Sequence, residues 1–115
     1  MTYTEITIND EIYKLRLNTR NTVALEKALG YNPIDILLQM DRNEVPKVQE
    51  LVMVLHYALQ QYNHNINLDK AYDIFDDYLA EDHTIFDFIN DVVVPVYQNC
   101  GLLSSKSEAT DEEKN

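Results

Sequence analysis

Polar and apolar residues alternate at the start of the chain, between residues 3 and 17. The alternation is interrupted once, at Asn9-Asp10, and such residues tolerate the left-handed backbone conformations of tight turns. A period of two is typical of β-strands with one buried face. The pattern predicts a β-hairpin over residues 3–17, packed on the helices that follow because an isolated hairpin is only marginally stable in water.

Apolar residues recur at helical spacing in the rest of the chain. Asn18 is a good N-cap, Gly30 is a good C-terminal stop, and Pro46 is tolerated in a first turn. We predict five helices, over about residues 19–30, 33–41, 46–63, 68–81 and 84–99. The second helix is almost wholly apolar and is therefore expected to be buried. Pro95 is expected to kink or end the fifth.

The end of the sequence is short of apolar residues. From residue 104 to residue 115 no large apolar side chain occurs, so burial cannot offset the entropy that ordering would cost. We expect one globular domain over residues 1–103 and a flexible acidic tail over residues 104–115. The predicted fold class is α+β and mostly helical, with an N-terminal hairpin followed by about five helices.

The chain of 115 residues has a formal net charge of −11, from 20 acidic and 9 basic residues. Because Lys and Arg supply much of the affinity for phosphates, this charge opposes binding to nucleic acid and to anionic membranes. No apolar run approaches the roughly 20 residues of a spanning helix, and the first residues lack the features of a signal peptide. These features predict a soluble protein that acts in the cytoplasm.

Acidic residues cluster around the fourth predicted helix. Four acidic residues are spaced by four along this helix: Asp69, Asp73, Asp77 and Glu81. Four more lie nearby in the sequence: Asp76, Asp82, Asp87 and Asp91. A divalent cation could bind there, but oxygen-ligand sites normally need carboxylates that converge from a loop or from several helices. A solvated acidic face is therefore favoured.

Other catalytic and metal-binding patterns are missing from the sequence. Zinc-binding spacing is absent among the three histidines, His56, His64 and His83. Cys100 is the only cysteine, so neither an internal disulfide nor a cysteine-based metal site can form. With two glycines in the chain, a phosphate-binding loop is also excluded. We expect no enzyme activity and no cofactor.

Two groups of residues are candidates for contact with a partner protein. The first lies in the strongly apolar fifth helix: Ile85, Phe86, Phe88, Ile89, Val92, Val93, Val96 and Tyr97. The second is taken from the eight tyrosines, which join apolar area to a polar tip and suit interfaces: Tyr31, Tyr57 and Tyr62. Packing within the protein's own core is the alternative for both groups, because an apolar stripe has the same sequence in either setting.

The order of features resembles a known family. The hairpin is followed by Asn21-Thr-Val-Ala-Leu-Glu-Lys-Ala-Leu-Gly-Tyr-Asn-Pro-Ile-Asp-Ile-Leu-Leu, then by amphipathic helices and a charged tail. Over about residues 3–100 this resembles the tail assembly chaperones of long-tailed phages and prophages of Gram-positive bacteria. The likeness rests on the apolar helix with Leu-Glu and on the Gly-Tyr-Asn-Pro junction, not on catalytic residues.

The resemblance implies a noncatalytic role in the host bacterial cytoplasm. Such a chaperone coats or solubilises the long helical tape measure protein, helps to recruit tail tube protein, and leaves before the virion is complete. Its partners would be these two proteins, with self-association as a further possibility. An apolar stripe laid into a groove is the expected mode of binding, and Ile85–Tyr97 is the first stretch to test.

The resemblance also implies a possible second product. Such families often make a longer protein by ribosomal slippage near the end of the short reading frame. Glu113-Lys114-Asn115 can be encoded through A-AAA-AAC, a seven-base sequence suited to slippage by one base. Lys-Asn is also common by chance in A-rich coding sequence, and an AAG codon at Lys114 would remove this heptamer.

Two other functions stay open. An acidic surface that mimics nucleic acid would make the chain a regulatory or inhibitory protein that occupies a basic site. A metal-dependent enzyme that uses the carboxylates is a third reading. Rising salt concentration would steeply weaken the binding of a nucleic-acid mimic to its basic partner, whereas the binding of a chaperone to its partner would change little. An unchanged melting temperature with calcium, magnesium and manganese would remove the support for the enzyme.

Overall fold

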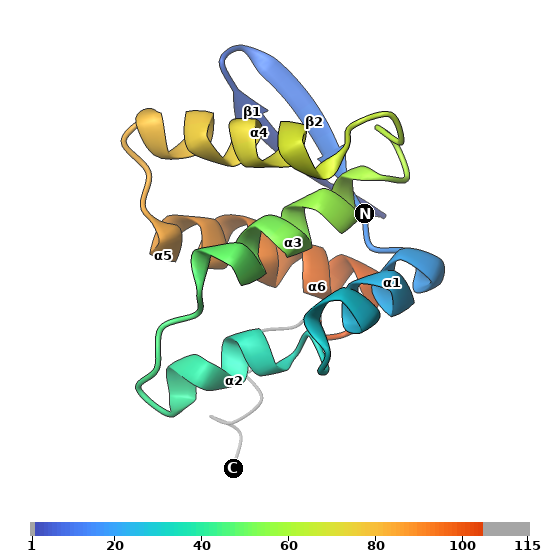
Figure 1. Ribbon diagram of the computed structural model, residues 1–115, viewed down its shortest axis with the longest axis vertical. Helices are drawn as coiled ribbons and strands as arrows, with labels where there is room; N and C mark the ends of the chain where they lie inside the picture. Colours follow the sequence, from blue (N-terminus) through green and yellow to red (C-terminus); the bar gives the residue numbers. More distant parts are fainter. Residues whose placement is uncertain (1, 105–115) are drawn as a thin grey trace.

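The N-terminal hairpin consists of β1 (Thr4–Ile8) and β2 (Glu11–Leu15) in the computed structural model, which describes residues 2–104 (Figure 1). Asn9 and Asp10 both have positive φ angles, 52° and 65°, as the favoured two-residue hairpin turns require. The strands pair in antiparallel register, and one face of the hairpin is buried in the core. The hairpin predicted over residues 3–17 is confirmed.

Helix α1 (Thr19–Leu29) begins and ends at the residues that the sequence indicates. The side chain of Asn18 accepts a 2.7 Å hydrogen bond from the backbone N–H of Asn21. Gly30 ends the helix with a φ of 86°, a conformation that glycine adopts without steric cost, and its N–H donates to the carbonyl of Glu26. Leu25 is the fully buried residue of this helix.

Helix α2 (Asp35–Asp41) lies within the predicted range, but the prediction that it is buried is wrong. Ile36 is fully buried, whereas the side chains of Leu38 and Met40 are 45% and 36% exposed. A helix points side chains in all directions around its axis, and here the core covers one side. Figure 1 shows α2 at the end of the molecule opposite the hairpin.

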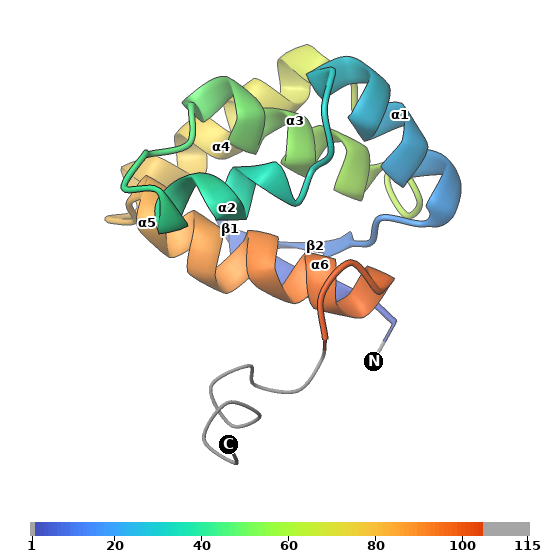
Figure 2. The same cartoon turned by 90° about the horizontal axis from the view of Figure 1, so that it is seen from below.

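Helix α3 (Val48–Leu59) occupies the centre of the fold. Figures 1 and 2 show α1 and α4 (Leu68–Ala80) on opposite sides of it, and both pack against it. The hairpin joins α3 through a 2.8 Å hydrogen bond from the N–H of Arg16 to the carbonyl of Ala58. The predicted range of 46–63 is too long, since the chain forms turns after Leu59. Asn67 caps α4 by accepting from the N–H of Lys70.

The last helical segment is continuous but changes its winding. It comprises α5 (Ile85–Phe88), the π-helical turn η1 (Ile89–Val93) and α6 (Val94–Cys100). The N–H of Val94 donates to the carbonyl of Ile89, five residues earlier. Pro95 does not end the helix. Because proline has no N–H to donate, the α-helical hydrogen-bond pattern is interrupted there, and the wider π-helical turn lies immediately before it.

One core joins all these elements. Its fully buried members come from both ends of the chain and include Leu15, Leu25, Ile36, Leu55, Phe88 and Tyr97. The α+β, mostly helical fold with a hairpin and five helices is therefore confirmed for residues 2–104. None of the helices in this range has the length and apolar character needed to cross a membrane. The tail predicted over residues 104–115 lies, from residue 105 on, outside the described residues.

Candidate protein-binding surface

The apolar residues of the last helical segment serve the protein's own core. Six of the eight candidates for partner contact are buried: Phe88, Ile89, Val92, Val93, Val96 and Tyr97. Their assignment to a partner surface is corrected accordingly, because an open binding groove cannot use side chains already covered by α3 and the hairpin. Ile85 is half-buried and Phe86 is exposed, so these two alone of the group face solvent.

The three candidate tyrosines have different settings. Tyr62 is partly exposed, but its ring meets the ring of Tyr3 edge-on at 5.7 Å between centroids. Tyr57 is half-buried and packs against His56, whose pKa is lowered by burial. Tyr31 lies between α1 and α2 and is exposed. Of the three, Tyr31 belongs to the largest group of exposed apolar side chains.

That group lies in residues 31–48, which we call the α2 surface. Five of the ten large hydrophobic side chains exposed within the described residues belong to it: Tyr31, Leu38, Met40, Val45 and Val48. The segment contains α2, the loops on either side and the first residue of α3. Because so many of the exposed apolar residues belong to this one segment of the chain, it is the candidate for contact with a partner protein.

The buried residue Glu50 connects the segments of the α2 surface to one another through hydrogen bonds. It is an acidic residue that is only 8% exposed, and three donors from three parts of the fold hydrogen-bond to its carboxylate. The hydroxyl of Tyr31 and the amide of Gln39 on α2 both donate to Oε2, the latter at 3.0 Å. The backbone N–H of Lys47 donates to Oε1 at 2.7 Å. One carboxylate therefore joins the α1–α2 loop, α2 and the start of α3.

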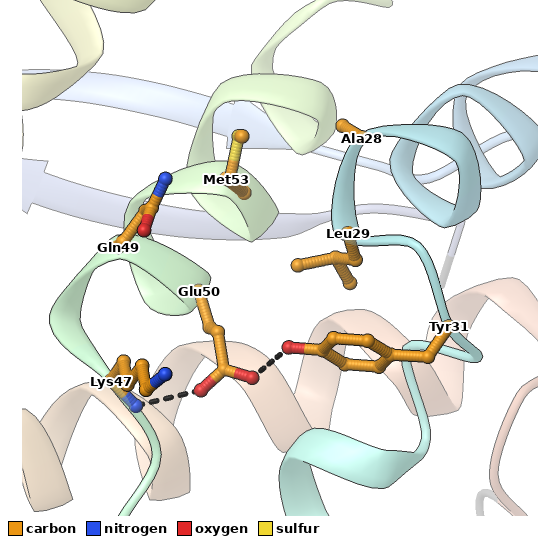
Figure 3. A pocket seen from close by; sticks show the side chains of 7 residues that line it. All are labelled: Ala28, Leu29, Tyr31, Lys47, Gln49, Glu50 and Met53. Carbon is orange, nitrogen blue, oxygen red and sulfur yellow. Dashed lines mark hydrogen bonds between the residues drawn. The ribbon is translucent and has the colours of Figure 1, made fainter.

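A small cavity opens beside this carboxylate, between α1 and α3 (Figure 3). Its volume is about 200 Å³, and it is lined by Ala28, Leu29, Tyr31, Lys47, Gln49, Glu50 and Met53. Pockets that take small organic ligands usually enclose about 300–1,000 Å³. Because the cavity is smaller and its carboxylate already has three donors, Glu50 is suited to holding the surface in place rather than to acting on a substrate.

A family model matches residues 2–114 and is described as a family of unknown function, DUF6096. The chain belongs to the DUF6096 family. No curated protein and no solved structure matches it significantly. The matched range takes in both the α2 surface and Glu50, and the family's description assigns neither of them a role.

Acidic side chains of this DUF6096 protein accept backbone hydrogen bonds at separate places in the fold. Glu81 accepts a 2.7 Å hydrogen bond from the N–H of Asn9 in the hairpin turn. Asp87 and Thr84 form a capping box at the start of α5, each side chain accepting from the other's backbone N–H. Within residues 2–104, no group of three or more His, Cys, Asp and Glu side chains is placed to hold a metal ion.

Cys100 is held at the end of α6. Its thiol donates a 3.4 Å hydrogen bond to the carbonyl of Tyr97, and burial raises the pKa of the thiol. A raised pKa keeps the thiol protonated, and the thiolate is the reactive form. The DUF6096 chain therefore uses Cys100 as a packing residue.

Sequence reasoning identified Tyr31 but missed the rest of this surface. Leu38 and Met40 lie in the helix that the sequence predicts to be buried, and Val48 falls in the apolar pattern of the third predicted helix. Glu50 carried a usable signal, because a glutamate in the first turn of a helix often reaches back to the N-cap backbone. Nothing in the sequence indicates that Tyr31 and Gln39 donate to the same carboxylate.

Proposed function

We propose that this protein is a noncatalytic tail assembly chaperone of a long-tailed phage or prophage of Gram-positive bacteria. It binds the tape measure protein in the host bacterial cytoplasm, aids recruitment of tail tube protein and is absent from the mature virion. The observation that carries the proposal is the α2 surface, where exposed apolar side chains gather on a segment tied down by Glu50.

The chemistry of the α2 surface suits a helical partner. Aliphatic and aromatic side chains give binding area without requiring a particular partner sequence, which a protein that covers a long helical chain needs. Because Glu50 already connects the surface to α3, ordering it on binding costs less entropy than ordering a free loop would.

The residues that carry the family resemblance also shape this surface. Gly30 turns the chain at the end of α1, and Tyr31 donates to Glu50. Asn32 accepts a 2.9 Å hydrogen bond from the N–H of Ile34 at the entrance to α2. Pro33 is buried, and its carbonyl accepts from Tyr97. The Gly-Tyr-Asn-Pro junction therefore sets where α2 lies. This supports the proposal that the α2 surface is the binding surface that the resemblance implies.

Co-expression with the tape measure protein of the same phage or prophage tests the proposal. The tape measure protein is expected to stay soluble and to co-elute in size-exclusion chromatography with the wild-type chain. The double variant Leu38→Ser, Val48→Ser should lose co-elution, while Ile12→Ser should keep it. Ile12 is a matched control because it is exposed on the hairpin at the opposite end of the molecule. Separate elution of the two wild-type proteins would contradict the proposal.

A second candidate function rests on the acidic face of α4. Asp69, Asp73 and Asp76 are exposed there, so a nucleic-acid mimic that occupies a basic protein remains a specific alternative. Such binding should weaken steeply between low and high salt, whereas binding through the α2 surface should change little. The salt dependence of any complex that forms therefore separates the two functions.

A further inference from the structure

One side of α1 carries an apolar centre between two cations. Arg20, Val23, Ala24 and Lys27 recur at the three- and four-residue spacing that places side chains on one helix face, and we call them the α1 stripe. The stripe lies on the side of α1 away from buried Leu25.

The cations of the α1 stripe have no acidic partner within residues 2–104. Arg20 and Lys27 form no ion pair there, whereas Arg42 bonds to Asp35 at 3.3 Å and to Glu44 at 3.2 Å. Val23 between them is 41% exposed. In a chain of net charge −11, two unpaired cations beside an exposed apolar side chain form a surface suited to an acidic partner with an apolar centre.

Helix α4 presents a surface of that kind. Asp69, Tyr72, Asp73 and Asp76 follow the same spacing, are exposed, and form what we call the α4 stripe. Tyr72 is 42% exposed and lies between the carboxylates. Lys70 is the one basic residue of α4, and it lies about 100° around the helix from Asp69. The stripe therefore has negative ends, and its centre holds Tyr72 beside Asp73, which lies three residues from Lys70 on the helix.

We propose that the α1 stripe of one copy of this chain binds the α4 stripe of a second copy. Seven residues separate the outer charges of each stripe, which corresponds to about 10 Å along a helix at roughly 1.5 Å per residue. Arg20 and Lys27 then face Asp69 and Asp76, and Tyr72 packs over Val23 and Ala24. Because both ends of a stripe have the same sign, the charges match whether the helices run parallel or antiparallel.

The position of the two helices determines what such a contact builds. α1 and α4 flank α3 on opposite sides, so one copy can use both stripes at once (Figures 1 and 2). A contact between different surfaces is heterologous, and it produces a ring or an extended array rather than a two-fold dimer. Repulsion between the net charges of neighbouring copies is screened beyond about 8 Å at physiological ionic strength. The charge complementarity of the two stripes therefore determines whether the copies associate.

Charge reversal of purified full-length chains tests this contact by sedimentation equilibrium over a wide range of protein concentration. The variant R20E/K27E and the variant D69K/D76K should each associate roughly tenfold more weakly than the wild type. An equimolar mixture of the two variants should associate like the wild type, since each supplies the stripe that the other lacks. The fourfold variant, in which both stripes are reversed, should associate with itself.

The two reversals separate a specific contact from a general charge effect. R20E/K27E makes the net charge four units more negative, and D69K/D76K makes it four units less negative. General repulsion would therefore weaken association in the first variant and strengthen it in the second. A second variant that associates more strongly than the wild type, a mixture that stays dissociated, or a wild type that is monomeric throughout would each overturn the proposal. None of these measurements requires the tape measure protein, so this proposal and the chaperone function can fail separately.

Discussion

The hydroxyl of Tyr97 donates a 2.9 Å hydrogen bond to the backbone carbonyl of Pro33, a residue 64 positions earlier in the chain. Both residues are buried, so the bond ties the last helix to the entrance of α2. Tyr97→Phe removes this donor, while the carbonyl keeps a 3.1 Å hydrogen bond from the backbone N–H of Ile36. We expect the free energy of unfolding to fall by about 1 kcal/mol, measured by urea denaturation. A variant as stable as the wild type would show that the bond does not hold α2 in place.

Tyr78 should respond to the same substitution in the opposite direction. Its side chain is buried and its hydroxyl has no hydrogen-bond partner among the described residues. Tyr78→Phe removes an unsatisfied polar group and keeps the stacking on His83, at 4.2 Å between ring centroids. We expect a gain of about 1 kcal/mol in the free energy of unfolding. A loss of stability in the same urea experiment would imply a partner for the hydroxyl.

Alkaline pH should destabilise the fold through this residue. Burial, with the carboxylates of Asp91 and Asp87 nearby, raises the pKa of Tyr78 from 10 to about 12. The folded state holds the phenol proton more tightly than the unfolded state, so its contribution is complete below pH 10 and is lost as the pH rises toward about 12. Burial raises the pKa of Tyr97 as well. Unfolding free energies measured from neutral pH into this range should fall less in Tyr78→Phe than in the wild type.

Glu50→Gln should loosen the α2 surface. The substitution puts amide hydrogens where the carboxylate accepts from Tyr31, Gln39 and Lys47, so at least one donor loses its acceptor. We expect a loss of about 1–3 kcal/mol and faster amide hydrogen exchange over residues 31–47. Tyr31→Phe removes one of the three bonds and should have a smaller effect. Unchanged exchange in Glu50→Gln would show that other contacts hold the segment.

Local signals predicted most of the fold. Asn9-Asp10, Asn18 and Gly30 each have one favoured backbone role, and the structure places all three in that role. Pro95 does not end the last helix, because a π-helical turn precedes it, and such a turn depends on packing that the sequence does not show. Helix existence was therefore easier to predict than helix continuity.

The candidate surface was harder to predict because burial is a property of the whole fold. The apolar residues of α2 and those between Ile85 and Tyr97 look alike in sequence, yet the second group fills the core and the first is partly exposed. A seven-residue helix at one end of the molecule has too few neighbours to cover all its sides. The role of Glu50 likewise depends on donors that come from separate parts of the chain.

The most direct test of the α2 surface is amide hydrogen exchange of this chain, alone and in the presence of the tape measure protein. Binding through that surface predicts slower exchange over residues 31–48 and unchanged exchange in the hairpin. Unchanged exchange over residues 31–48, or protection confined to the acidic residues of α4 and α5, would contradict the proposed binding surface.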